Sequence, residues 1–507
     1  MKKSRFISEL FSEQNITPTE GLVRYSYLQH IEQEEKTAQL AAQRLLDWYL
    51  RDREAILDHL KEAAKKTFAL DEVDAWQFPL INGVPRIIKR ISMAYANAPE
   101  RTLVKNGEDL KPGAKEYDLY AKMFQYIDID KKMKEADRYS TLLNTIHLEV
   151  VPRKDAIDWD FRLRPSVIVV PDPEDYLQFL KLGYRWVPFD PETLITQEGW
   201  VYWDDESHIF VYSNTQDIGM SLNSGLNPYK GIIPIVTIRK IEQHDYWGKY
   251  GADLVDAFEQ ANLQLANLWE NGFLQTHGQP IATNLGIKTP GALKIGPRNP
   301  FVIEDLTIDD YKPTLEFVTP ESRLDEARNL VDWFIKNTGN SYGLPQGAWS
   351  LDQTPESGFA KFMDNIELLE NREDEIQQWI DIEQELFKKS VMVYNRWARE
   401  QNHEKFPEDL ELKITFPSIS FPESPTEEAT RWTILISGGL RTSIDYYMQT
   451  DGLTEEEALE KAKKVAEQKK MLSELSEPEM PKLPDDGIQK GKGGDAGKEE
   501  GNEFQKG

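Results

Sequence analysis

The chain has 507 residues, of which 87 are acidic and 60 basic, so its formal net charge is −27. This length exceeds one ordinary domain and predicts about two to four. Cysteine is absent, which excludes disulfides, cysteine-based zinc sites and a cysteine nucleophile. The acidic balance has the wrong sign for a protein that grips nucleic acid through lysine and arginine.

The N-terminal part of the chain carries helical patterns. Residues 1–20 are polar, and the basic start of the chain lacks the apolar run of a secretory signal. No stretch of the sequence reaches the length of a membrane span. Apolar residues at helical spacing predict helices over Leu22–Lys66, Gly83–Ala98, Tyr117–Asp130 and Lys132–Thr145.

From His147 onward the pattern changes to strands. Short runs of β-branched and aromatic residues are separated by turn residues, which favours a mixed or antiparallel sheet. The predicted strands are Leu148–Val151, Phe161–Arg164, Val167–Val170, Trp186–Phe189, Trp200–Trp203, His208–Tyr212 and, closing the sheet, Ile235–Arg239.

Two helices with an insert between them come next. The first is expected over Asp253–Thr276 and the second over Pro320–Asn337, where Thr319 precedes Pro320 as a helix start. The insert holds several prolines and short β-like runs. These runs are Pro280–Thr283, Ala292–Ile295 and Phe301–Ile303.

A loop and one very long helix follow. The loop spans Gly339–Ser357 and is rich in Gly, Asn, Ser and Pro. From Thr354 to Glu400 apolar residues recur at heptad spacing without a helix breaker, which predicts a helix roughly 65 Å long at about 1.5 Å per residue. Acidic residues interrupt the apolar stripe, so a helix crossing a large subunit is favoured over a coiled coil.

The C-terminal part is mostly helical. Leu412–Phe416 resembles one more strand, and a proline-rich linker leads to helices over Thr426–Ile436, Ser443–Met448 and from Thr454 to about Met471. Thr454 and Glu457 form a capping-box pattern at the start of the last helix. Residues 473–507 have almost no core-forming side chains and are expected to be disordered.

The order of helix, small β-containing insert, helix, loop and very long helix resembles the portal proteins of tailed bacteriophages. The similarity is greatest to siphophage portals of the Bacillus type. It also includes Gly231–Val236 before the first helix of the pair and Ser437–Ser443 before the final helix. The resemblance covers nearly the whole chain and rests on order and length, with no catalytic motif.

The resemblance implies an α+β, multidomain, phage-portal-like subunit with a mixed β-sheet wing, two stem helices, a small clip, one very long helix and a helical crown. The implied segments are: 1–249, N-terminal part of the wing; 250–277, stem helix 1; 278–318, clip; 319–338, stem helix 2; 339–357, tunnel loop; 358–422, wing with long helix and strand; 423–472, crown; 473–507, disordered tail.

The resemblance also implies roles for individual side chains. The loop would face a DNA channel, and the first stem helix would pack between subunits with apolar side chains that look unsatisfied in one chain. The loop candidates are Tyr342, Leu344, Trp349 and Leu351. The stem candidates are Leu254, Phe258, Leu265 and Trp269.

Basic residues near these elements are candidates for contact with DNA or with docking partners. For each of them a solvated position or a local salt bridge is the more common role of such a residue. Near the channel these are Arg323, Arg328, Lys336 and Lys361. In the insert, where terminase or adaptor proteins would dock, they are Lys288, Lys294 and Arg298.

By resemblance the chain forms a ring, usually of twelve copies, in the virion at one capsid vertex, and assembles in the cytoplasm of the bacterial host. Expected partners are double-stranded DNA, terminase, the major capsid and scaffolding proteins, and head-completion or tail adaptor proteins. No enzyme activity, cofactor, metal or membrane contact is expected. The alternatives are a minor capsid or scaffold-associated head protein, and a large cytoplasmic enzyme with an unrecognised site.

Overall fold

The protein is described here by a computed structural model, in which a defined set of residues can be placed. These residues are 18–68, 76–153, 155–186, 198–213, 218–220, 225–249, 251–277, 279–283, 301–303, 314–318, 324–344, 366–400, 404–407, 409–417, 425–439, 441–451 and 453–475. The chain divides into two compact units, Met1–Phe421 and Pro422–Gly507. The fold is α+β, as the sequence predicted, with several antiparallel sheets.

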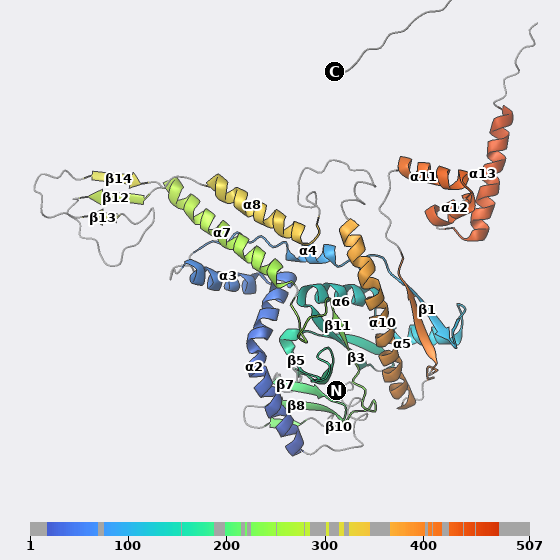
Figure 1. Ribbon diagram of the computed structural model, residues 1–507, viewed down its shortest axis with the longest axis horizontal. Coiled ribbons are helices and arrows are strands. Elements are labelled where there is room, and N and C mark those ends of the chain that lie inside the picture. The colour runs from blue at the N-terminus through green and yellow to red at the C-terminus, as the bar shows by residue number, and fades with distance from the viewer. Residues whose placement is uncertain are drawn as a thin grey trace, which may run out of the picture. The chain divides into compact units, whose positions relative to one another are not determined.

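The helices of the first unit follow the predicted order (Figure 1). They are α2 (Pro18–Leu50), α3 (Arg53–Phe68), α4 (Val84–Ile91), α5 (Lys115–Met123), α6 (Ile129–Leu143), α7 (Ala252–His277), α8 (Leu324–Ser341) and α10 (Ile366–Glu400). The predicted start of the long helix, Thr354–Asn365, lies outside the described residues.

The strands of the first unit form separate sheets. The strands are β1 (Glu100–Lys105), β2 (Glu108–Asp109), β3 (Thr145–Pro152), β4 (Ile157–Arg162), β5 (Val167–Pro171), β6 (Phe179–Trp186), β7 (Glu198–Trp203), β8 (Ser207–Ser213), β9 (Ile218–Met220), β10 (Gly225–Leu226), β11 (Ile235–Arg239), β12 (Gln279–Thr283), β13 (Phe301–Ile303), β14 (Thr314–Val318) and β15 (Leu410–Thr415). Their orders are β15-β1-β2, β10-β8-β7-β6-β5 with β9 on β8, β11-β3-β4, and β13-β12-β14.

The prediction of one sheet from 147 to 239 is wrong, because its strands divide between two sheets. β11 pairs with β3 and not with β8. The division falls after β4, where Arg164–Ser166 forms a short 3₁₀ turn. Pro165 in that turn has no N–H to donate to a ladder, so β5 begins a new sheet.

A buried carboxylate joins these two sheets. Glu149 on β3 is 3 % exposed. It accepts hydrogen bonds from Arg162 at 2.7 Å, from the Tyr184 hydroxyl at 3.1 Å and from the Trp203 indole at 3.0 Å. Burying a charge is costly unless it is paired and hydrogen-bonded, and these three donors come from β4, β6 and β7. Glu149 therefore fixes the position of one sheet against the other.

Helix boundaries differ from the predicted ones where side chains take over backbone hydrogen bonds. The helix expected over 83–98 ends at Ile91, and the Ala94 N–H donates to the Asp137 carboxylate at 3.1 Å. The helix expected to reach Asp130 ends at Met123. Asp128 accepts from the Lys131 N–H and caps α6, so the preceding helix has to end before it.

The long helix α10 lies against the body of the first unit and packs on β15, β3, β11 and β4. Its carboxylate Glu383, 2 % exposed, accepts from the Tyr95 hydroxyl at 2.6 Å and from Arg101 at 2.7 Å. The Trp159 indole donates to the Ser390 hydroxyl at 3.0 Å. Both apolar and polar side chains of α10 thus find partners in other elements of the same unit.

The second unit contains the three short helices that the sequence predicted: α11 (Pro425–Ser437), α12 (Ser443–Asp451) and α13 (Glu455–Leu475). The Trp432 and Tyr446 rings meet edge to face with centroids 5.1 Å apart. At the start of α13 the Thr454 N–H donates to the Glu457 carboxylate at 3.0 Å, which is one arm of the predicted capping box.

Candidate assembly surface

The two helices α7 and α8 form a hairpin that carries the three-stranded sheet β13-β12-β14 between them. Figure 1 shows α7 and α8 side by side, with the small sheet beyond their joined ends. This is the helix–insert–helix order that the sequence predicted. Within the described residues α8 packs extensively only on α7, while α7 also contacts α2, α3 and α4.

The first half of α7 is firmly anchored. Leu254 and Phe258 are 0 % and 2 % exposed. The Asn262 side chain accepts from the Ile81 N–H at 2.8 Å and donates to the Ile81 carbonyl at 2.7 Å. A Cβ at Gly83 would lie 2.4 Å from the Phe258 ring, so the chain before α4 passes close to α7. The expectation that Leu254 and Phe258 are exposed in one chain is wrong, because α7 is anchored beside the segment that leads into α4.

An ion cluster strengthens the same anchorage. Arg44 on α2 donates to Glu259 at 2.9 Å and to Asp256 at 2.7 Å. Burial raises the pKa of Glu259, although the charge of Arg44 opposes that shift. The cluster spans α2 and α7 and holds the base of the hairpin against the body.

Beyond its anchored base, the hairpin is different, because both of its helices expose large apolar side chains there. Trp269 on α7 is 57 % exposed, and Leu330 and Trp333 on α8 are 56 % and 58 % exposed. The expectation of unsatisfied apolar side chains is confirmed at Trp269, while Leu265 is partly buried. Burying one such side chain contributes about 1.5–3 kcal/mol, so this face favours a contact with another surface.

Sequence reasoning missed Leu330 and Trp333 as exposed residues. In the helix expected over Pro320–Asn337, Leu330 and Val331 both fit the spacing of an apolar face with Leu324, Ala327 and Phe334, but Val331 is 7 % exposed and Leu330 is open. Trp333 lies outside that apolar face. The position of Trp333 outside the apolar face of the helix could have indicated its exposure, because an apolar side chain on the polar face needs a separate partner.

Two of the four basic channel candidates can be located. Lys336 forms an ion pair with Asp332 at 2.7 Å, one turn away on α8, and both side chains are about half exposed. Arg328 is exposed on the same helix. Arg323 and Lys361 lie outside the described residues, as do the insert candidates Lys288, Lys294 and Arg298.

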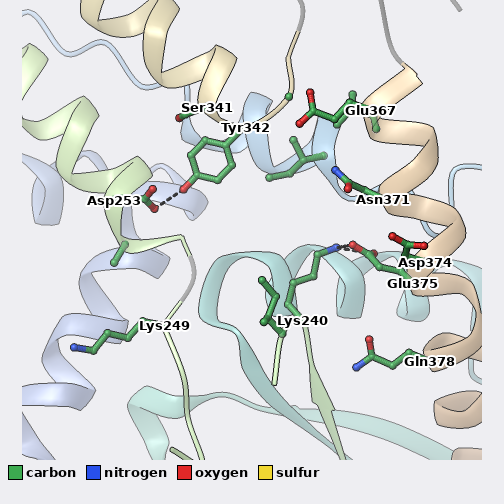
Figure 2. A pocket seen from close by; sticks show the side chains of 15 residues that line it. Lys240, Lys249, Asp253, Ser341, Tyr342, Glu367, Asn371, Asp374, Glu375 and Gln378 are labelled. Atoms are coloured by element: carbon green, nitrogen blue, oxygen red, sulfur yellow. Dashed lines mark hydrogen bonds and ion pairs between the residues drawn. The ribbon is translucent and has the colours of Figure 1, made fainter. Parts of the chain in front are cut away.

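The loop candidates are only partly described. The Tyr342 hydroxyl donates to the Asp253 carboxylate, which ties the end of α8 to the start of α7 (Figure 2). Leu344 is 3 % exposed, so the structure places it in the core and not on an open face. Trp349 and Leu351 lie outside the described residues.

A cavity of about 780 Å³ lies where α7 begins, α8 ends and α10 begins. Two pairs of its polar lining side chains are joined: Tyr342 with Asp253, as above, and Lys240 with Glu375, an ion pair at 2.6 Å (Figure 2). Lys240 also lies 3.6 Å from Asp137, whose burial raises its pKa to about 6. This arrangement joins β11, α6 and α10 beneath the hairpin.

The part of the chain that the structure describes carries neither a metal-binding cluster nor a membrane-spanning helix. No group of three or more His, Asp or Glu side chains in these residues could hold a metal ion. No described helix is long and apolar enough to cross a bilayer.

No protein-family model matches the chain, and no curated protein matches its sequence. Among solved structures, a chain in the virion of a native gene transfer agent particle is 13 % identical, with a TM-score of 0.36. That alignment covers 74 % of this chain and 90 % of the other.

Two further structures are similar at the same level. A chain in the neck of an empty gene transfer agent particle, computed with C6 symmetry, is 12 % identical, with a TM-score of 0.36 over 74 % of this chain and 90 % of that one. A chain in the neck of a native particle, computed with C12 symmetry, is 12 % identical, with a TM-score of 0.35 over 73 % and 89 %. TM-scores this low do not establish a common function.

Proposed function

We propose that this protein is a portal subunit of a tailed phage or phage-like particle. Copies of the chain would form a closed ring, expected to contain twelve, at one vertex of the capsid. The ring would conduct double-stranded DNA during packaging and ejection, and would dock the terminase and later the head-completion or tail proteins. Its location would be the virion, after assembly in the cytoplasm of the bacterial host.

The observation that carries this proposal is the α7–α8 hairpin. Its base is anchored through Phe258 and Asn262, while Trp269, Leu330 and Trp333 stay open farther along. A surface of this kind on a rigidly held element is typical of an assembly contact. If one copy's hairpin meets a different surface of the next, the heterologous contact closes into a ring when the rotation allows it.

The role proposed for the chain is mechanical. With a net charge of −27, a channel lined by such chains would repel phosphates and let DNA slide. No enzyme activity is proposed, and the ATP-driven step would belong to the terminase. Tyr342 marks the start of the segment proposed to approach the DNA, because it follows directly on α8.

The purified full-length chain tests this proposal by mass photometry and negative-stain microscopy. Rings with a central hole and a mass of about twelve chains are the expected result. If only monomers or dimers form across salt and protein concentrations, the same measurement is repeated with capsid and scaffolding proteins co-expressed. Absence of rings in both settings would contradict the proposal and favour a minor head protein.

A further inference from the structure

A second cleft, of about 420 Å³, lies between the loop Pro228–Ile232, the C-terminal part of α10, and the residues Pro407 and Leu410. Its described lining contains three basic side chains and no acidic one, although the whole chain carries a net charge of −27. The basic side chains are Lys230, Lys388 and Arg396. Apolar side chains complete the lining, including Ile232, Val391 and Met392.

The walls of this cleft are held in place by hydrogen bonds. The Asn395 side chain on α10 donates to the Phe406 carbonyl at 3.1 Å and accepts from the Phe406 N–H at 2.8 Å. Across the cleft, the Asn227 side chain donates to the Asp204 carbonyl at 3.0 Å and accepts from the Tyr229 N–H at 2.9 Å. Both walls are therefore preorganised, which lowers the entropic cost of binding a ligand.

The loop on one wall ends in a tight turn with an unfavourable residue. Lys230 and Gly231 have φ angles of 55° and 87°, and the Ile232 N–H donates to the Tyr229 carbonyl at 3.2 Å. This is a type I′ turn, whose first central position prefers Asn, Asp or Gly. A lysine there is strained, and strain of this kind concentrates at binding sites. Lys230 thus sits at a position where backbone stability alone favours another residue.

The cleft exposes basic side chains next to an apolar one. Lys230 and Lys388 are exposed, and no ion pair joins either of them to an acid in the described ranges. Ile232, beside Lys230, is 49 % exposed. A helix dipole acts on charges within the last turn of a helix, and Lys388 lies well before the last turn of α10, which ends at Glu400. The dipole therefore accounts for neither lysine.

We propose that this cleft is a docking site for an acidic peptide segment of a partner protein, with at least one apolar side chain. Carboxylates of the peptide would pair with Lys230 and Lys388, and the apolar side chain would cover Val391 and Met392. Nucleic acid fits less well, because a phosphate backbone binds basic side chains and would leave the apolar lining of the cleft uncovered. Tyr229 is 7 % exposed and offers no free face for a base to stack on.

The test begins with a random library of short peptides selected on the full-length protein. The probe is the most enriched peptide, labelled with fluorescein, and its Kd is measured by fluorescence anisotropy. The expected consensus contains Asp or Glu together with Leu, Ile or Phe. Lys388→Glu is expected to weaken binding of this peptide by about tenfold, because it places a like charge against the carboxylates.

Lys230→Asn is the decisive variant. If Lys230 served only the fold, the variant would leave the peptide affinity unchanged, whereas a binding role predicts a weaker affinity. Asn suits the left-handed backbone, so the variant should unfold at the same or a higher temperature while it binds the peptide about threefold more weakly. Arg51→Asn is the matched control: Arg51 is exposed, has φ 62° and does not line the cleft. It should show similar thermal behaviour and unchanged peptide affinity.

Three results would overturn the proposal. The first is a selection that enriches no acidic, apolar-containing peptide. The second is an unchanged peptide affinity in both Lys388→Glu and Lys230→Asn. The third is a loss in these variants of affinity for a labelled DNA duplex and not for the peptide. Each result is read on whichever oligomer the protein forms, so the outcome is independent of ring formation.

Discussion

The long helix α10 and the α7–α8 hairpin both carry apolar side chains along extended helices, but their exposure differs. Among the side chains that the structure describes on α10, no large apolar one is exposed. α10 packs on four strands, and its buried Glu383 is held by Tyr95 and Arg101. The hairpin is covered only at its base, and Trp269 and Trp333 remain more than half exposed. The comparison distinguishes a helix whose apolar side chains stabilise its own subunit from helices whose exposed apolar side chains are available to contact another subunit.

The largest expected effect concerns the open half of the hairpin. Replacing Trp269 and Trp333 together by Gln should weaken self-association by at least about a hundredfold, because buried tryptophans commonly dominate interfaces. The unfolding temperature of the single chain should hardly change. Mass photometry at matched concentrations measures the effect.

The control for that pair is Leu40→Gln with Leu50→Gln, two side chains on α2 that are 60 % and 61 % exposed. These changes remove a similar exposed apolar surface outside the hairpin, and association should persist. Equal loss of association in both double variants would remove the distinction between the hairpin and other exposed apolar residues.

The second prediction concerns α10. Glu383→Ala should lower the free energy of unfolding by about 3 kcal/mol, because the buried Tyr95 hydroxyl loses its acceptor and Arg101 keeps only the half-exposed Asp130 as a partner. Glu385→Ala, on the same helix but half exposed and paired with Lys389, should cost less than about 1 kcal/mol. Urea unfolding measures both variants, and similar midpoints would show that α10 is not held through Glu383.

The third prediction concerns the effect of pH on stability through Asp137, the buried α6 carboxyl group beside Lys240. The folded-state pKa of Asp137 is raised to about 6 by burial, so the folded protein binds this proton more readily than the unfolded chain. The stability contributed by protonated Asp137 is present at low pH and is lost as pH rises through about 6.

Asp137→Asn should remove that dependence. Between about pH 4 and about pH 7, the free energy of unfolding of the wild type should fall by about 2 kcal/mol relative to the variant. Urea titrations at each pH measure the difference. A constant difference across this range would mean that Asp137 keeps its ordinary pKa beside Lys240.

The smallest effect compares Gly83, which lies beside α7, with Gly272, which lies within it. Gly83→Ala places a Cβ 2.4 Å from the Phe258 ring and should destabilise the chain by about 1–3 kcal/mol. Gly272→Ala, in the open half of α7 with nothing within 4 Å of its Cβ, should stabilise the helix by up to about 1 kcal/mol. Thermal unfolding distinguishes the two signs, and a destabilising Gly272→Ala would show that this part of α7 is not open.

Local features of the fold could be predicted from the sequence because they depend on neighbours along the chain. Apolar spacing predicted α7 and α10, and the Thr454–Glu457 pattern predicted the start of α13. Strand β14 was not predicted, although its residues 314–318 alternate in polarity, because the surrounding insert is rich in prolines.

The candidate surface could be predicted only in part. The helix–insert–helix order and the exposure of Trp269 followed from the sequence, whereas the burial of Leu254 and Phe258 did not. Periodicity defines which side chains share a helix face, but not which other element covers that face. The cleft at the Lys230–Gly231 turn could not be predicted either. The sequence indicates a turn at this pair, but not that α10 side chains lie opposite it.

The sequence by itself determined the helices, most of the strands and the order in which they occur, because hydrogen bonding and apolar periodicity act over a few residues. Tertiary structure alone decided that the strands after residue 147 form two sheets joined by Glu149, and that α7 is covered at its base and open beyond it. Those outcomes depend on contacts between residues far apart in the chain, such as Glu149 with Trp203, 54 positions apart, and Arg44 with Glu259, 215 positions apart. No local pattern encodes such distant pairs.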